Sequence, residues 1–197
     1  TNEGNQAMKN LVDWPRDRYL NIWVCANMGG AAGYSMYPSS VAGGWGAAAD
    51  GIVVLSTYVG GIGTSNPSHS HTLSHEAGHW LNLKHCWGDS NNPGLASNCS
   101  MDDGVSDTPN TEGWTTCNLL GATCGSAKDN VENFMEYSYC SKMFTEGQKS
   151  RMLAALNSSV ADRNNLWTDA NLALTGVLGD PELCVAALHS NAQTVCT

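Results

Sequence analysis

The stretch HEAGHWLNLKH at residues 75–85 decides the fold of this chain. On an α-helix, positions i and i+4 share one face, so His75 and His79 can bind the same metal ion. Glu76 lies to one side of that pair, where its carboxylate can reach a water at the metal rather than the metal itself. The pattern therefore predicts a helix that carries two metal ligands and a general base.

His85 is expected to be the third ligand, but only if the helix ends before it. In a continuous helix His85 would lie roughly 15 Å from His75 along the axis, too far for a shared ion. Asn82 is the expected hinge, because Asn tolerates the left-handed conformation that closes helices. His71, one turn before His75, is a rival ligand on geometry alone. The other histidines lack the complete spacing and are expected to be solvated: His69, His71 and His189.

The composition predicts one secreted globular domain. The 197 residues are enough to enclose a core, and only 14% are charged. The net charge of −9 argues against nucleic acid and anionic membranes as partners. No apolar run reaches the ~18 residues that membrane insertion needs. We expect a monomer that meets proteins or peptides as substrates.

Eight cysteines without a CxxC pair favour disulfides in an oxidising compartment over a thiolate metal site. Cys184 and Cys196 are isolated near the end and are expected to pair with each other. Because the chain begins at Thr1 without a signal sequence, we interpret it as a processed, extracellular product.

β-Forming residues predict two strands, at residues 19–26 and 51–57. Between them, residues 28–50 are dominated by Gly, Ala and Ser and are expected to form a long loop.

Two helices are predicted from their start signals. The metal helix is expected to begin at Asn66 as N-cap, with Pro67 at the first helical position. A capping box at residues 145–148 is expected to open a helix that runs over 149–156. Residues 160–197 give no clear pattern.

Several blocks in order resemble the pappalysin family of metzincin zinc metalloproteases, bacterial members in particular. They are YLNIWV at 19–24, HEAGHWLNLKH at 75–85, DGVSDTP at 103–109, NFMEYS at 133–138 and MFTEGQKSRM at 143–152. The resemblance implies an α+β, metzincin-like zincin. Its small, twisted, mixed β-sheet and active-site helix lie above an irregular C-terminal lobe, which disulfides and calcium stabilise and which has one long helix.

We expect an N-terminal lobe over residues 1–86, a C-terminal lobe over 87–160 and a tail over 161–197. The family has more chain before the first strand, including a helix that backs the sheet. We hypothesise that the tail partly fills that role through its apolar residues: Leu172, Leu174, Val177 and Leu178.

The resemblance also implies roles for two residues after the metal helix. Met135 would be the Met-turn residue beneath the metal ligands, and Tyr137 would help to stabilise the reaction intermediate. From the residues alone, ordinary core packing is the alternative for both. The implied disulfides are Cys99–Cys124 and Cys117–Cys140, which leaves Cys25 and Cys86 to pair or to stay reduced.

Residues 101–108 resemble the family's calcium loop. Independently, carboxylates crowded beside Gly104 suit a hard cation with oxygen ligands, although a solvated acidic turn is the alternative. The expected ligands are Met101, Asp102, Val105 and Thr108.

Two positions depart from the family pattern. Asn82 stands where the family usually has Gly, which Asn should tolerate. Tyr139 stands where some members have an acidic residue that selects a basic residue after the cut, which puts an Arg or Lys preference in doubt.

The leading hypothesis is a secreted zinc-dependent endopeptidase, in which metal-activated water hydrolyses peptide bonds with Glu76 as general base and acid. The substrate would lie extended along residues 51–57. One alternative is a non-catalytic, zinc- and calcium-stabilised binding module on the same scaffold, which would need no such carboxylate. The other is a zinc-dependent hydrolase of small amides.

Overall fold

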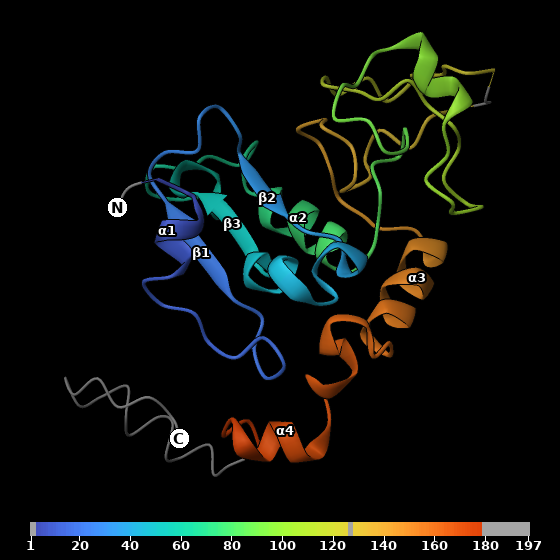
Figure 1. The fold of residues 1–197 in the computed structure, drawn as a ribbon. Helices are drawn as coiled ribbons and strands as arrows, with labels where there is room; N and C mark the ends of the chain where they lie inside the picture. The colour runs from blue at the N-terminus through green and yellow to red at the C-terminus, as the bar shows by residue number, and fades with distance from the viewer. Residues whose placement is uncertain (1–2, 126–127, 179–197) are drawn as a thin grey trace.

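The computed structural model describes residues 3–125 and 128–178, which fold around a small three-stranded sheet (Figure 1). Its strands are β1 (Ile22–Cys25), β2 (Gly33–Ser35) and β3 (Ile52–Leu55), in the order β1-β3-β2. β1 runs parallel to β3, and β2 runs antiparallel to it. The predicted α+β class with a small mixed sheet is thereby confirmed.

Both predicted strands are shorter than expected, and a third strand was missed. Residues 56–58 form a 3-10 turn that ends β3, and β2 lies inside the predicted loop over 28–50. Since β3 is the central strand, its two edges are already hydrogen-bonded. The prediction that residues 51–57 offer a free edge to an extended peptide is therefore wrong.

One face of the sheet is covered by the short helix α1 (Gln6–Lys9). Met8 packs there against Cys25 and Val53, which the strand register places on the same face. The Lys9 ammonium donates to a backbone carbonyl and lies over two aromatic rings of this face. The N-terminal segment thus backs the sheet.

Three of the four apolar tail residues expected to back the sheet are too exposed for that role, and the fourth, Leu172, is half-buried. Leu174, Val177 and Leu178 are each more than half exposed. The segment around α4 (Asp169–Leu174) instead contacts the loop before β1 through polar groups, because the Asn171 side chain donates to a backbone oxygen there. Cys184 and Cys196 lie outside the described residues.

The opposite face of the sheet packs against α2 (Thr72–Trp80), the predicted metal helix (Figure 1). This helix begins later than expected. The Asn66 side chain accepts from the backbone N–H of Ser68 and stabilises a separate turn, and no side chain caps α2. The predicted start at Asn66 is therefore wrong.

Asn82 closes α2 in the left-handed conformation, with φ 73°. The N–H of Leu83 donates to Gly78 O at 2.9 Å, and the N–H of Asn82 donates to His79 O at 2.9 Å. These two bonds form a Schellman motif, which turns the chain back after the second histidine.

Helix α3 (Glu146–Leu156) starts at the predicted capping box, in which Thr145 and Gln148 satisfy each other's backbone N–H groups. The Gln148 side chain also exchanges hydrogen bonds with Asn133. The start of this helix therefore anchors the segment that leads to Met135.

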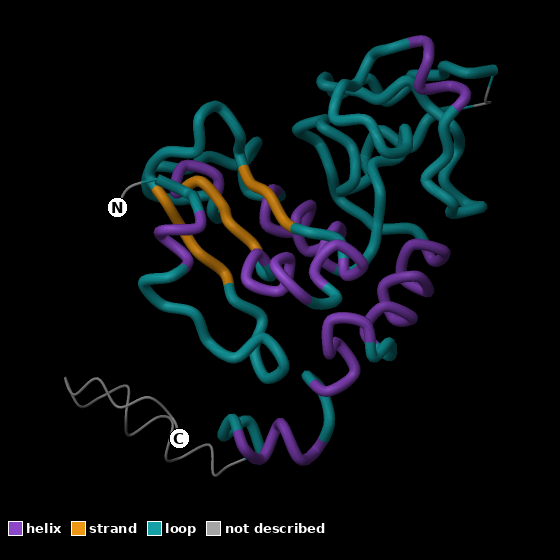
Figure 2. Tube along the Cα trace, in the orientation of Figure 1, coloured by secondary structure: helices purple, strands orange, loops and turns teal. Residues whose placement is uncertain are grey.

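Residues 87–125 and 128–145 contain no α-helix or strand, and Figure 2 draws them as loop except for the short 3-10 helix Ala96–Ser100. Disulfides join Cys99 to Cys124 and Cys117 to Cys140, the two pairings that the family resemblance implies. The free thiols of Cys25 and Cys86 are buried in different core clusters, so they do not pair with each other.

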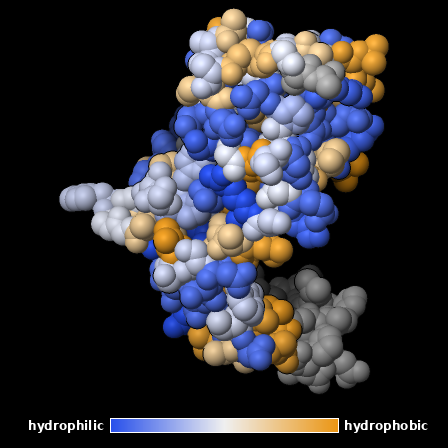
Figure 3. All heavy atoms as spheres, turned by 90° about the vertical axis from the view of Figure 1, so that its right-hand side faces the viewer, coloured by the Kyte–Doolittle hydropathy of each residue, from blue (hydrophilic) through white to orange (hydrophobic). Residues whose placement is uncertain are grey.

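On the face seen in Figure 3, hydrophilic residues gather across the middle and hydrophobic residues toward the two ends. Within the described part of the chain, no helix combines the length and apolar character needed to span a bilayer.

Candidate active site and metal centre

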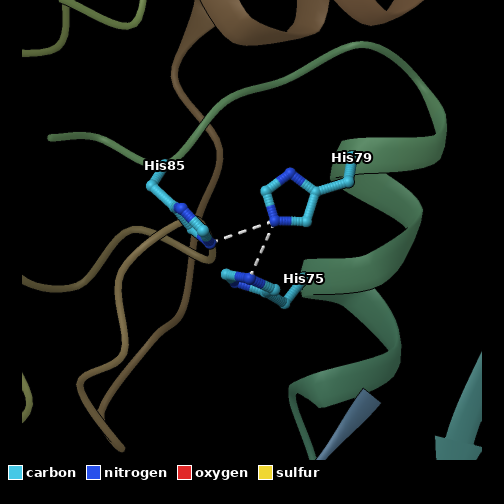
Figure 4. Close-up of side chains that lie close together, drawn as sticks. All are labelled: His75, His79 and His85. Atoms are coloured by element: carbon cyan, nitrogen blue, oxygen red, sulfur yellow. Dashed lines mark hydrogen bonds between the residues drawn. The ribbon is translucent and has the colours of Figure 1, made fainter. Parts of the chain in front are cut away.

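Three imidazoles converge where the chain turns back after α2 (Figure 4). The Nε2 atom of His79 lies 3.1 Å from Nε2 of His75 and 3.1 Å from Nε2 of His85. Tetrahedral zinc with bonds of about 2.1 Å would separate its nitrogen ligands by about 3.4 Å. The spacing therefore suits a single ion held by three side chains. His71, the rival on geometry, stays outside this cluster.

A backbone carbonyl fixes the orientation of each ring. The Nδ1 atom of His75 lies 2.7 Å from Phe134 O, that of His79 lies 2.7 Å from Leu83 O, and that of His85 lies 2.9 Å from Ser90 O. A carbonyl only accepts, so each Nδ1 carries the proton and each Nε2 presents a lone pair. Second partners of this kind are typical of histidines that ligate metals.

Burial keeps all three rings neutral. It lowers the pKa of His75 to about 3 and of His85 to about 2, with a further contribution from the neighbouring histidines. Burial also lowers the pKa of His79. Three lone pairs only about 3 Å apart repel each other unless a cation lies between them, so the donor set fits zinc.

Glu76 is buried beside the triad with its carboxylate against β2. Burial raises its pKa to about 7, although a hydrogen bond from the Ser35 hydroxyl lowers it in part. A carboxyl poised near neutral pH suits proton transfer.

Met135 lies under α2, and Tyr137 lies beside two of the metal-binding histidines. Met135 is fully buried under α2, and Gly78 makes room for it, because a Cβ there would overlap the Met135 sulfur. The Tyr137 ring is partly exposed, with its centroid 5.4 Å from that of His75 and 5.0 Å from that of His85.

A cleft of about 670 Å³ opens beside Glu76. Its walls include Gly33 of β2, Phe134 and Tyr139. His69 and His71 also line it and are half-buried against the rings of Tyr58 and Phe134, so they are solvated only in part. His189 lies outside the described residues.

Glu136 also lines the cleft, and no motif or spacing had singled it out. Its carboxyl group is buried, and one oxygen accepts from the backbone N–H of Trp114 at 2.8 Å. Its other oxygen has no hydrogen-bond partner among the described residues. Burial raises the pKa of Glu136 to about 8, against the lowering effect of that hydrogen bond.

This shift predicts that Glu136 makes stability depend on pH. Between its ordinary pKa of 4.5 and about 8, the unfolded chain loses the Glu136 proton while the folded chain keeps it. The free energy of unfolding should therefore fall as pH rises, by up to about 1.4 kcal/mol per pH unit from this group. Glu136→Gln should flatten that slope in urea unfolding at pH 5, 6.5 and 8. Glu146→Gln, on an exposed side chain, is the control, and parallel curves for Glu136→Gln and the parent would refute this account.

In the expected calcium loop, Asp103 organises the chain. Its buried carboxylate accepts from the N–H of Val105 at 2.9 Å and from the Thr108 hydroxyl at 2.8 and 2.9 Å. Met101 and Asp102 are exposed. Within the described residues, the histidine triad is the one cluster of three or more metal-ligating side chains, so this loop is not such a cluster.

Comparison with known proteins gives consistent matches. Residues 3–157 match the model of a peptidase family described as Pregnancy-associated plasma protein-A. An extracellular metalloprotease of Sordaria macrospora is 33% identical over 159 residues, which cover 77% of this chain and 53% of the relative. Extracellular metalloprotease 1 of Coccidioides posadasii is 34% identical over 157 residues, 76% of this chain and 54% of the relative. The chain spans about half the length of these curated relatives.

Among solved structures, mature mirolysin of Tannerella forsythia, in complex with a cleaved peptide, superposes with a TM-score of 0.72 at 30% identity. The match covers 87% of this chain and 67% of the mirolysin chain. The likeness extends beyond the histidine cluster to most of the fold.

Proposed function

We propose that this chain, which belongs to the pappalysin (Pregnancy-associated plasma protein-A) family of peptidases, is an extracellular zinc-dependent endopeptidase. The family predicted from the sequence is thereby confirmed. The observation that carries the proposal is the convergence of three neutral imidazoles beside a buried carboxylate, with Nε2 of His79 3.1 Å from Nε2 of His75 and 3.1 Å from Nε2 of His85. The names of the fungal relatives, extracellular metalloproteases, support the location outside the cell.

In the proposed reaction His75, His79 and His85 hold the ion. Zinc, when bound, supplies Lewis acidity that activates water and polarises the scissile carbonyl. Glu76 takes the proton of the attacking water and passes it to the leaving amine. The Tyr137 hydroxyl donates a hydrogen bond to the carbonyl oxygen as negative charge develops on it.

The substrate is proposed to bind along β2 rather than β3. β2 is an edge strand, and residues 30–33, which lead into it, line the cleft. The backbone N–H and C=O groups of an edge strand can hydrogen-bond to an extended peptide whatever the sequence of that peptide. Tyr139 lies exposed at the cleft, where it would meet a side chain of the substrate.

The two lobes expected from the sequence remain part of the proposal, over residues 1–86 and 87–160. Both segments line the same cleft, the first through Gly33 and Glu76 and the second through Phe134 and Tyr139. This supports placing the boundary between the two lobes at the cleft.

Calcium in the loop over residues 101–108 also remains a proposal. Its support is the concentration of oxygen atoms among the expected ligands, including the Asp102 carboxylate and the backbone carbonyls of Met101 and Val105. The hydroxyl of Thr108 donates to Asp103, and its oxygen keeps lone pairs that a cation could use.

Selective metal removal tests both sites. With denatured casein and a peptide library as substrates, 1,10-phenanthroline should abolish cleavage and stoichiometric zinc should restore it. A calcium-selective chelator should lower the melting temperature while zinc content stays constant. Binding of peptides without cleavage in the zinc-loaded protein would favour the non-catalytic module, and an unchanged melting temperature would remove calcium from the account.

A further inference from the structure

Ser35 lies directly beside the carboxylate of Glu76. The strand register places Ser35 and Gly33 on the face of β2 that packs against α2. The Ser35 hydroxyl lies 2.9 Å from Glu76 Oε2 and 2.8 Å from the backbone oxygen of the same residue. In the part of the chain that the structure describes, this hydroxyl is the only hydrogen-bond donor to the Glu76 carboxylate.

Gly33 completes the contact from the same strand. A Cβ at this position would lie 2.8 Å from Glu76 Cγ and 2.9 Å from Oε1, closer than side chains tolerate. The absence of a side chain therefore lets the carboxylate lie against the strand. Among the described residues, one oxygen accepts from Ser35 and the other has no donor.

We propose that Ser35 is a positioning residue for Glu76, which its hydroxyl holds in one orientation over Gly33 with Oε1 left to accept a proton. The inference rests on the proposed function, in which Glu76 is the general base. Glu side chains have several rotatable bonds, and a misplacement of about 1 Å in a reacting group can cost ~100-fold in rate. β2 is also the strand along which the substrate is proposed to bind. The three residues of β2 would therefore align the general base with the bound peptide.

Ser35→Ala tests the role of the hydroxyl. In the zinc-loaded protein with a fluorogenic peptide, kcat should fall by about 10- to 100-fold while KM and bound zinc stay unchanged. Ser35→Thr, which keeps a hydroxyl, should restore most of kcat. Ser39→Ala, in an exposed turn, is the matched control and should behave as the parent. A crystal structure of zinc-loaded Ser35→Ala should show the Glu76 carboxylate turned away from its parent orientation.

Gly33→Ala tests the second contact without touching the hydroxyl. It should lower kcat in the same way, whereas Gly43→Ala, at an extended glycine with no atom near the new Cβ, should not. Full kcat in Ser35→Ala, or loss of zinc from it, would overturn the positioning role. If Glu76→Gln itself keeps full activity, the assignment of Glu76 as general base in the proposed function fails instead. An inactive Glu76→Gln beside a fully active Ser35→Ala would overturn this inference alone.

Discussion

Glu76→Gln is expected to lower kcat for peptide hydrolysis by about 1,000-fold or more, because an amide cannot take a proton from water. The replacement has nearly the same shape and keeps an oxygen that can accept from the Ser35 hydroxyl. The three histidines are untouched, and their Nδ1 partners are the backbone carbonyls of Phe134, Leu83 and Ser90. Zinc binding should therefore survive.

The measurement combines single-turnover peptide cleavage with zinc analysis of the same sample. Glu146→Gln removes an equally charged group from an exposed position on α3 and should leave kcat unchanged. A Glu76→Gln protein that binds zinc and still cleaves within about tenfold of the parent rate would show that Glu76 is not the base. Loss of zinc together with activity would show instead that Glu76 supports the metal site.

The metal cluster could be predicted because short-range geometry determines it. Two histidines four residues apart must share a face of a helix, and the third can reach them only if the chain reverses. Asn82, in the left-handed conformation, makes that reversal. Each of these steps depends on residues within one short segment, so periodicity and capping rules are sufficient.

Two of the supporting groups could not be predicted, because they come from distant parts of the chain. Ser35 lies 41 residues before Glu76, and Phe134 O lies 59 residues after His75. β2 itself has only three residues, too few to display the alternation that identifies a strand. Asn66 shows a different limit of prediction from the sequence. The same side-chain cap can start either a helix or a single turn, and at Asn66 it starts a turn.

A buried ion pair that connects the tail to the metal helix also could not be predicted from the sequence. Arg163 donates to both oxygens of Asp50, at 2.8 and 2.7 Å, across 113 residues. Its guanidinium lies 3.7 Å from the centroid of the Trp80 ring, and the Trp80 indole N–H donates to Asp50 at 3.0 Å. Trp80 is the last residue of α2 and follows His79 directly, so this cluster holds the end of the metal helix.

Arg163→Met should therefore destabilise the fold strongly. The change leaves the Asp50 carboxylate buried without its principal cation, and breaking a buried pair in this way costs about 3–5 kcal/mol. For a chain of this size the melting temperature should fall by roughly 10 °C. Asp50 keeps its bonds from the backbone N–H of Gly51 and from Trp80, with Arg16 at 3.6 Å, so we expect a weakened fold rather than an unfolded chain.

The double variant Asp50→Asn/Arg163→Met separates a lost ion pair from lost packing. If the uncompensated charge is the main cost, the double variant should be more stable than Arg163→Met alone, as measured by urea unfolding of all three proteins. Lys149→Met removes a cation from an exposed pair on α3 and should change the free energy of unfolding by no more than about 0.5 kcal/mol. Equal stability of Arg163→Met and the parent would mean that the tail does not hold α2. An unstable double variant would assign the effect to the contact with Trp80 instead of the charge.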